Sequence, residues 1–434
     1  MIYPRDALSP VIPFLERKEF ISISGPRQSG KTTLLKMIGA HLHGELKIDR
    51  RLITLITFED RRLLAQFERD PVAFVQSYAP SGIDGILYLM IDEFQYARDG
   101  GQKLKLIFDT CENIKILITG SSSLDLKAQV GRFMVGRIVS FTLCPFNFGE
   151  YLSTKSERLE TAYRGKSGQL WQWLEGRGAF PGERGLDIFH QELQPLYEDY
   201  CIWGGYPAVV LAGSPLERRK IFSEILNSFI LKDIKTLLEL ATDRSLLRLS
   251  QYLAAQAGNI VVYRSLSEAS NLDFRNVKKH LEILKETFVC REVRPFFTSR
   301  QRELSKNPKI YFLDNGFRNS LMEAMQGLEM RPDAGAIIEN TVFIRLNQLH
   351  NGLGKINFWR TKAGAEVDFV LHLEGQLLPV EVKYSLFKSE TIPRGLVSFI
   401  GSFRPRRAVV LTRSFWGIRK IDETETTFIP AYYL

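Results

Sequence analysis

Residues 20–38 read FISISGPRQSGKTTLLKMI, and this stretch decides the fold. It begins with residues typical of a buried strand, passes through GPRQSGKTT, and continues as an apolar helix. The central part fits the pattern G-x-x-x-x-G-K-[ST], in which backbone N–H groups and the positive end of a helix dipole surround phosphate oxygens. The predicted nucleotide-binding residues are therefore Gly25, Pro26, Arg27, Gln28, Ser29, Gly30, Lys31, Thr32 and Thr33.

Two residues of this loop and two acids further along the chain are expected to perform the chemistry of a nucleotide site. Lys31 is expected to reach the β and γ phosphates of ATP, and the Thr32 hydroxyl to bind Mg²⁺. A buried strand over residues 86–91 ends in Asp92 and Glu93. Asp92 is expected to be a second Mg²⁺ ligand, and Glu93 a catalytic base that activates water. An acid pair with no phosphate loop before it is commonly just a strand that ends in solvated turn residues.

Short β-branched runs alternate with helical patterns between residues 19 and 141, which is typical of a parallel sheet covered by helices on both faces. The expected strands are 20–24, 52–57, 86–91, 114–118 and 138–143. The fourth of them leads into Thr119 and Ser121, whose hydroxyls suit a catalytic contact with the γ-phosphate or the attacking water. A loop that caps the following helix explains these two hydroxyls equally well.

The composition is that of a soluble globular protein with several domains: 434 residues, 44% hydrophobic and 25% charged. No apolar run has the length of a membrane helix and no signal peptide is recognisable, so we expect a cytoplasmic protein with no membrane partner. The net charge is +9, and residues 401–420 hold six basic residues and no acid. This excess suits DNA as a partner, although solvated surface charges explain it equally well.

Residues 148–240 have a mostly helical pattern, which predicts a lid or insertion. Residues 241–330 contain a helix, a break at Asn271, a second helix over 274–287 and a following strand, the outline of a winged helix-turn-helix that meets DNA. In the second helix, the apolar stripe is Val277, Leu281 and Leu284, and the basic residues are Arg275, Lys278 and Lys279. A helical bundle or a protein-docking module fits the same pattern.

Residues 331–434 return to a mixed α/β pattern that contains the segments EVDFV and PVEVK. These segments resemble the D…(D/E)-x-K signature of restriction-type nucleases. If Glu374 and Gly375 form a two-residue hairpin turn, Asp368 lies directly opposite Glu381. Because two carboxylates so close repel each other unless a cation separates them, we expect Mg²⁺ or Mn²⁺ to bind there.

Two further residues complete this expected metal site. Lys383 is a candidate catalytic residue that orients water or stabilises charge on a phosphate. Glu339, on the preceding helix, is a candidate third metal ligand. The alternative is an ordinary cross-strand ion pair between Glu366 and Lys383, with Asp368 solvated.

Several motifs together resemble the prokaryotic AAA-type ATPases that carry a C-terminal domain of unknown function with a restriction-endonuclease-like core. Besides the phosphate loop, the motifs are LMIDEFQ (89–95), ITGSSS (118–123), GRFMVGRIVSFTLCPFNFGEY (131–151) and WGGYP (203–207). Together with the patterns above, the resemblance predicts an α/β protein with a P-loop AAA-type core at 1–147, a helical lid at 148–240, a winged helix at 241–330 and a restriction-endonuclease-like domain at 331–434. It also implies that Arg137 is an arginine finger or sensor and that Pro207 lies beside the adenine.

The sequence supports two hypotheses about function. The first is an ATP-hydrolysing enzyme whose nucleotide state regulates an action on nucleic acid, with metal-dependent cleavage as one form of that action. The second is a nucleotide-dependent switch or scaffold whose C-terminal domain only binds DNA or protein. Assembly into a homo-oligomer would let Arg137 complete the nucleotide site of a neighbouring subunit.

Overall fold

The computed structural model describes residues 2–121, 131, 133–182, 185–228, 243–349, 355–373 and 375–434. The chain forms two compact units, of which the first consists mainly of Met1–Pro145 and the second of most of the remaining residues. Within the described residues, no helix combines the length and the apolar character needed to cross a lipid bilayer.

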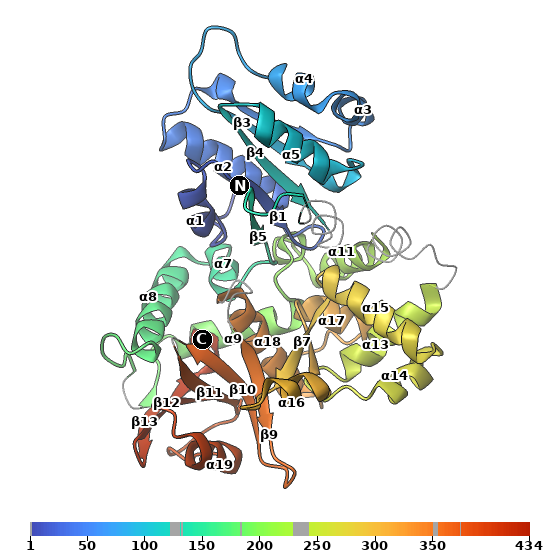
Figure 1. Cartoon of the computed structure of the whole chain (residues 1–434). Helices are drawn as coiled ribbons and strands as arrows, with labels where there is room; N and C mark the ends of the chain where they lie inside the picture. Colours follow the sequence, from blue (N-terminus) through green and yellow to red (C-terminus); the bar gives the residue numbers. More distant parts are fainter. Residues whose placement is uncertain are drawn as a thin grey trace. The chain divides into compact units, whose positions relative to one another are not determined.

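The first unit is built on a parallel sheet of five strands in the order β2-β3-β4-β1-β5 (Figure 1). The strands are β1 (Phe20–Ser24), β2 (Ile53–Thr57), β3 (Leu87–Asp92), β4 (Ile114–Gly120) and β5 (Ile138–Thr142). All of them are rich in β-branched or apolar residues, as a sheet covered on both faces requires. The predicted parallel α/β sheet is therefore confirmed.

Helices cover both faces of this sheet because successive strand residues point to opposite sides. Along β3, Leu89 and Ile91 join an apolar cluster with the helices that follow β2 and β3, whereas Tyr88 and Met90 join a second cluster with α1 and α2 (Figure 1). The helices are α1 (Leu8–Val11), η1 (Ile12–Phe14), α2 (Lys31–Gly44), η2 (Arg50–Leu52), α3 (Arg61–Arg69), α4 (Pro71–Gln76), η3 (Phe94–Tyr96) and α5 (Gly100–Thr110).

The strand order decides which sequence motifs become neighbours. Strand β4 lies between β3 and β1, and all three run in the same direction. The carboxyl ends of these three strands therefore lie at the same end of the sheet, where ligands of open α/β sheets bind. Arg137 lies at the other end of the sheet, beside the amino ends of the strands. It directly precedes β5, and its carbonyl oxygen accepts a hydrogen bond from the N–H of Phe20, the first residue of β1 (2.8 Å).

The second unit contains a mixed sheet of nine strands in the order β6-β13-β14-β12-β11-β10-β9-β7-β8. The strands are β6 (Gly185–Leu186), β7 (Cys290–Pro295), β8 (Lys309–Phe312), β9 (Ile356–Arg360), β10 (Glu366–Leu373), β11 (Gln376–Val382), β12 (Arg407–Thr412), β13 (Phe415–Ile421) and β14 (Thr424–Pro430). Because β7 pairs with β9 in parallel, the sheet is continuous across residues 330 and 331, where the sequence pattern predicts a boundary between two domains.

The helices of the second unit include the consecutive helices α14 and α15, which precede the antiparallel pair β7 and β8 at the place where the sequence predicts a helix-turn-helix. On α15 the predicted apolar stripe is buried and the three predicted basic residues are exposed. The helices are α7 (Phe148–Ser153), α8 (Glu157–Leu174), α9 (His190–Trp203), α10 (Pro207–Val210), α11 (Pro215–Ser228), α13 (Asp243–Ala255), α14 (Tyr263–Ser270), α15 (Phe274–Glu286), α16 (Arg300–Ser305), α17 (Asn315–Leu321), η6 (Leu328–Met330), α18 (Ala334–Leu349), α19 (Arg394–Phe403) and η7 (Ala431–Tyr433).

A buried carboxylate holds the WGGYP turn. Asp314 accepts hydrogen bonds from the backbone N–H groups of Gly205 and Phe317, both at 2.8 Å, and so caps α17 as well. Gly204 has a left-handed φ of 68°, and a Cβ there would lie 2.4 Å from the carboxylate oxygens of Asp314. The turn therefore requires glycine because the acid packs directly against the backbone.

Burial raises the pKa of Asp314 from 3.8 to about 6 against the opposing effect of these N–H groups. The folded chain thus binds this proton more tightly than the unfolded chain, so the free energy of unfolding is expected to fall by about 3 kcal/mol as the pH rises from about 4 to about 6. The Asp314→Asn variant should lose this contribution. Urea unfolding of both proteins across this pH range measures it, with exposed Asp422→Asn as control; a pH-independent difference between wild type and Asp314→Asn would contradict the expectation.

Candidate nucleotide site and C-terminal acidic cluster

The phosphate loop has the tight backbone that its glycines predict. Gly30 has a left-handed φ of 96°, and a Cβ at Gly25 would lie 2.2 Å from the carbonyl oxygen of Leu143. The buried ammonium of Lys31 donates to the carbonyl oxygens of Gly25 (2.9 Å) and Pro26 (3.0 Å). The lysine therefore lies folded against its own loop, at the amino end of α2.

Asp92, the last residue of β3, connects the end of β4 with the start of α2. Its carboxylate accepts hydrogen bonds from the hydroxyl of Thr32, at the start of α2, and from the hydroxyl of Thr119, at the end of β4. The Thr32 bond is 2.5 Å long, and Asp92 is buried. A carboxylate beside a hydroxyl is the donor set that Mg²⁺ uses when phosphates supply further ligands, so these residues fit a magnesium ion bound with a nucleotide.

Glu93 follows Asp92 in a strained conformation. Its φ is 55°, and its N–H donates to the Thr119 hydroxyl and to Asp92, both at 3.2 Å. Its carboxylate accepts a hydrogen bond from the Gln95 amide, which also donates to the Ser121 hydroxyl (3.3 Å). A left-handed non-glycine residue is costly and is often retained at functional sites.

The structure thus brings Lys31, Thr32, Asp92, Glu93 and Thr119 together with Ser121. Ser122 and Ser123, the remaining hydroxyls of the ITGSSS motif, lie outside the described residues. The hydroxyl of Thr119 donates a hydrogen bond directly to Asp92. The hydroxyl of Ser121 is linked to Glu93 through the Gln95 amide, which donates to both side chains.

Arg5 is a neighbour of the phosphate loop that sequence reasoning missed. Its buried guanidinium donates to the carbonyl oxygen of Ser29 (2.8 Å) and to that of Cys144 (2.6 Å). It therefore links the loop to the chain that follows β5. Nothing in the residues around Arg5 signals this role, because its partners are distant in sequence.

Of the two residues implied by the family resemblance, Arg137 lies apart from this cluster within the first unit. Arg137 pairs with Asp109 (3.1 Å) at the amino ends of the strands, whereas the phosphate loop follows the carboxyl end of β1, and its role stays a prediction. Pro207 begins α10 in the second unit, while the phosphate loop belongs to the first. Its predicted contact with adenine stays a prediction.

The hairpin predicted near the C-terminus forms with the predicted register. Leu373 pairs with Gln376 and Phe369 with Val380, and one further step along this ladder sets Asp368 opposite Glu381. Glu374, the first residue of the predicted turn, lies outside the described residues. The Asp368 carboxylate accepts a hydrogen bond from the Val382 N–H (2.8 Å).

Lysines, rather than free carboxylates, dominate the surroundings of this pair. The ammonium of Lys309, on β8, is buried and lies 3.3 Å from a Glu339 oxygen and 2.6 Å from a Glu366 oxygen. Lys383 pairs with Glu381 at 2.9 Å. The alternative of a Glu366 to Lys383 ion pair is therefore wrong, because each partner forms its ion pairs elsewhere.

The electrostatics of the cluster follow from burial. Burial, assisted by the charges of Glu339 and Glu381, raises the pKa of Asp368 well above its ordinary value, so this carboxyl is not the solvated acid of that alternative. Burial also raises the pKa of Glu381, while Lys383 acts in the opposite direction. Burial lowers the pKa of Lys309, but Glu339, Asp368 and Glu366 outweigh it, and the net pKa shift is upward.

The expected third metal ligand, Glu339, is already engaged. Its carboxylate accepts a hydrogen bond from the Tyr311 hydroxyl and pairs with Lys309. Throughout the described ranges, no three His, Cys, Asp or Glu side chains are grouped so that they could hold a metal ion. One oxygen of Glu381 is buried and accepts no hydrogen bond from described residues, so the Asp368 and Glu381 pair remains the part of the cluster that fits a cation.

Comparison with known proteins assigns three segments of the chain. Residues 17–152 match the family described as an AAA domain. Residues 194–329 and 334–433 match two domains of unknown function, DUF8612 and DUF4143. The predicted AAA-type P-loop ATPase domain is confirmed by the first match, whereas the winged helix and the restriction-endonuclease-like core stay predictions.

Relatives in several prokaryotes resemble most of the chain. An uncharacterized protein of Haemophilus influenzae is 24% identical over 446 residues, which cover 100% of this chain and 99% of the relative. One of Mycobacterium tuberculosis is 24% identical over 387 residues, covering 88% of this chain and 74% of the relative. Among solved structures, a Walker-type ATPase of Pyrococcus abyssi matches with a TM-score of 0.43 and 15% identity over 74% of this chain and 96% of that one.

Proposed function

We propose that this protein hydrolyses ATP in its AAA domain and that its nucleotide state controls how the second unit binds nucleic acid. The observation that carries the proposal is the Asp92 carboxylate, which accepts hydrogen bonds from the hydroxyls of Thr32 and Thr119 beside the phosphate loop. Motifs far apart in sequence meet there at one sheet edge. Such a meeting is what phosphoryl transfer to water requires, because catalysis of this reaction consists of positioning and charge stabilisation.

Each residue of the site has a role in this proposal. Backbone N–H groups of residues 27–33 bind the phosphates, and Lys31 exchanges its two carbonyl partners for phosphate oxygens. Thr32 and Asp92 hold Mg²⁺, which neutralises charge on the phosphates. Glu93 orients the attacking water and accepts its proton, and Gln95 positions the Glu93 carboxylate.

Arg137 acts, in this proposal, on the nucleotide of a neighbouring subunit. Its position at the amino ends of the strands, away from the phosphate loop of its own subunit, supports a role in another subunit. An arginine supplied from another subunit stabilises transition-state charge. The ATPase rate per molecule should then rise with protein concentration, and Arg137→Ala should abolish that rise; a rate per molecule independent of concentration would contradict this role.

The nucleic-acid interface that we propose is the helix-turn-helix followed by β7 and β8, arranged as a winged helix. Exposed Arg275, Lys278 and Lys279 on α15 support it, since cations on such a helix contact phosphates. Arg407, by contrast, donates to the Trp173 carbonyl and lies over its ring at 4.3 Å, which leaves exposed Arg404 and Arg406 as the alternative cations.

Full-length protein should bind duplex DNA with an affinity that falls steeply with salt, because binding to phosphates releases counterions. Replacing Arg275, Lys278 and Lys279 with alanine should reduce the slope of log affinity against log salt by about 1 for each phosphate that the protein no longer neutralises. Arg404→Ala with Arg406→Ala is the matched control. If only the control variant reduced the slope, the interface would lie at that second site.

Coupling between the two units is tested with the Glu93→Gln variant, which is expected to retain ATP. Its affinity for duplex DNA should differ between ATP-bound and nucleotide-free protein at one fixed salt concentration, because coupling requires different affinities in the two states. Equal affinities in both states would contradict nucleotide control.

A second candidate function for the C-terminal segment is binding without cleavage. Lys309 and Lys383 already neutralise the acids of the cluster, and this observation favours the binding role. The competing candidate, a metal-dependent nuclease with a restriction-endonuclease-like core, draws support from the hairpin register and from the buried free oxygen of Glu381. Nicking of supercoiled plasmid with Mg²⁺ or Mn²⁺ that disappears in Asp368→Asn would favour the nuclease; absence of nicking would favour binding alone.

A further inference from the structure

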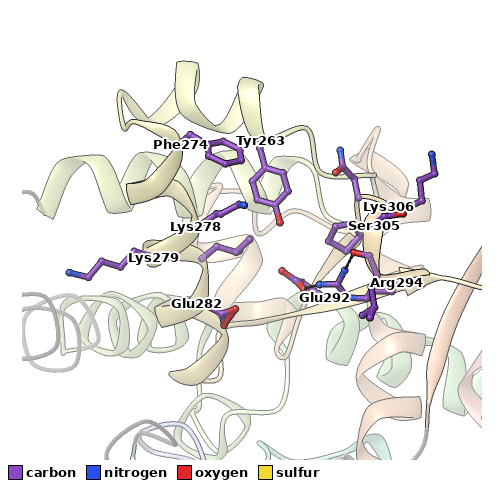
Figure 2. A pocket seen from close by; sticks show the side chains of 13 residues that line it. Tyr263, Phe274, Lys278, Lys279, Glu282, Glu292, Arg294, Ser305 and Lys306 are labelled. Atoms are coloured by element: carbon purple, nitrogen blue, oxygen red, sulfur yellow. Dashed lines mark hydrogen bonds and ion pairs between the residues drawn. The ribbon is translucent and has the colours of Figure 1, made fainter. Parts of the chain in front are cut away.

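A pocket of about 590 Å³ lies beside the helix-turn-helix of the second unit. One wall comes from α14 and α15, and the other from β7 and residues 304–308 (Figure 2). Its volume is in the range of sites that take small molecules or single nucleotides. The pocket is separate from both the phosphate loop and the acidic cluster, since it shares none of their residues.

An aromatic pair forms the upper rim of the pocket in Figure 2. Phe274, the first residue of α15, is 51% exposed, and its ring meets that of Tyr263 edge to face at 5.7 Å between centroids. The ammonium of Lys278 lies 4.4 Å from the centroid of the Phe274 ring. The ring is therefore held in place by its neighbours while about half of the residue stays exposed to water.

Positive charge lines the pocket beside this ring. Lys278, Lys279 and Lys306 line the pocket and form no ion pair with a carboxylate in the described part of the chain. The two acids of the lining are already paired: Glu282 with Lys285 at 2.7 Å, and Glu292 with Arg294 at 3.1 Å. The free charges of the pocket are thus cationic, which suits a polyanion.

We propose that this pocket binds an unpaired nucleotide of single-stranded nucleic acid, with the base stacked on Phe274 and the flanking phosphates on Lys279 and Lys306. The inference rests on the proposed nucleic-acid function and names its substrate class. A base exposes its flat face only when it is unstacked, whereas a duplex presents base edges in its grooves. An exposed aromatic ring bordered by cations is the combination that single strands require.

The test measures binding of full-length protein to a labelled oligothymidylate of about 12 nucleotides and to a blunt duplex, by fluorescence anisotropy at one salt concentration. Phe274→Ala should weaken binding of the single strand about fivefold to 100-fold, since the base has no ring to stack on, and leave duplex affinity nearly unchanged. Phe274→Trp should retain single-strand binding because it keeps a stacking face. Leu216→Ala, at a side chain 78% exposed on α11, is the matched control and should change neither affinity.

A second variant keeps the test independent of the folding of Phe274→Ala. Lys279 is exposed, and Lys279→Ala should reduce the salt slope of single-strand binding by about 0.7, the value for one phosphate of a single strand. If both Phe274→Ala and Lys279→Ala kept the single-strand affinity of the wild type, the pocket proposal would be overturned. The proposed function would still stand in that case, provided that the protein binds duplex DNA. Polyglutamate that displaced the oligonucleotide at equal charge concentration would also overturn it, in favour of an acidic peptide. Absence of binding to both nucleic acids would instead contradict the proposed function itself.

Discussion

Replacing Glu93 with glutamine is expected to lower the rate of ATP hydrolysis about 100-fold or more, while ATP binding stays nearly unchanged. Glutamine keeps the size of the side chain and can still contact Gln95, but it cannot accept a proton from water. The phosphate-binding N–H groups, Lys31 and Thr32 are untouched by this change. Single-turnover hydrolysis and fluorescent nucleotide binding measure the two quantities separately.

Lys31→Ala supplies the contrasting result. Loss of the ammonium removes a positive charge from beside the phosphates, so this variant should lose ATP affinity as well as turnover. Glu45→Gln, at an exposed acid next to the end of α2, is the matched control for the Glu93 change and should hydrolyse ATP at the wild-type rate. A Glu93→Gln protein that hydrolysed ATP as fast as wild type would remove Glu93 from the proposed mechanism.

Replacing Lys309 with methionine should produce the largest loss of stability, about 3–5 kcal/mol in the free energy of unfolding. Methionine fills a similar volume but removes the ammonium that lies among Glu339, Glu366 and Asp368, and of these acids Glu366 keeps Arg360 at 3.5 Å. Partly buried carboxylates that lose their cation destabilise the fold, because the surrounding protein does not supply another charge to stabilise them. Urea unfolding of the full-length protein at neutral pH measures the change.

Two further variants define the cause of that loss. Adding Glu339→Gln to Lys309→Met should recover part of the stability, since one uncompensated charge is removed. Lys420→Met, at an exposed lysine that pairs with Glu423 (3.0 Å), should change the free energy of unfolding by less than about 1 kcal/mol. Wild-type stability of Lys309→Met would show that the acids are not held by this lysine.

Added Mg²⁺ also distinguishes the two candidate roles of the acidic cluster. If Asp368 and Glu381 bind a divalent cation, Mg²⁺ should restore part of the stability that Lys309→Met loses, because an ion that binds only the folded state shifts unfolding by mass action. Magnesium that left the unfolding of the variant unchanged would support a cluster whose counter-ions are lysines alone.

Local sequence patterns were sufficient to predict much of the nucleotide site. The phosphate loop is a continuous motif, and a run of apolar residues that ends in Asp92 and Glu93 predicts a buried strand with acids at its end. Parallel strands bring such ends to one edge, which the structure confirms. The register of the hairpin that contains Asp368 and Glu381 was predictable for a similar reason, since a two-residue turn and the alternation of strand side chains determine it.

Other features required the tertiary structure. Nothing near Lys309 in the sequence indicates that it reaches Glu339 and Glu366, and nothing near Asp314 indicates that it holds the WGGYP turn. The pairing of β7 with β9, which makes one sheet of segments that the sequence pattern divides, was equally unpredicted.

The sequence by itself thus determined which residues can bind phosphate and which strand ends bear acids, because both depend on residues that are neighbours in the chain. Only the tertiary structure decided which of those acids have a cation beside them and which cations stay free for a ligand. The reason is physical: the charge and pKa of a buried group depend on burial and on the few ångströms around it, and here those surroundings come from strands and helices far apart in sequence.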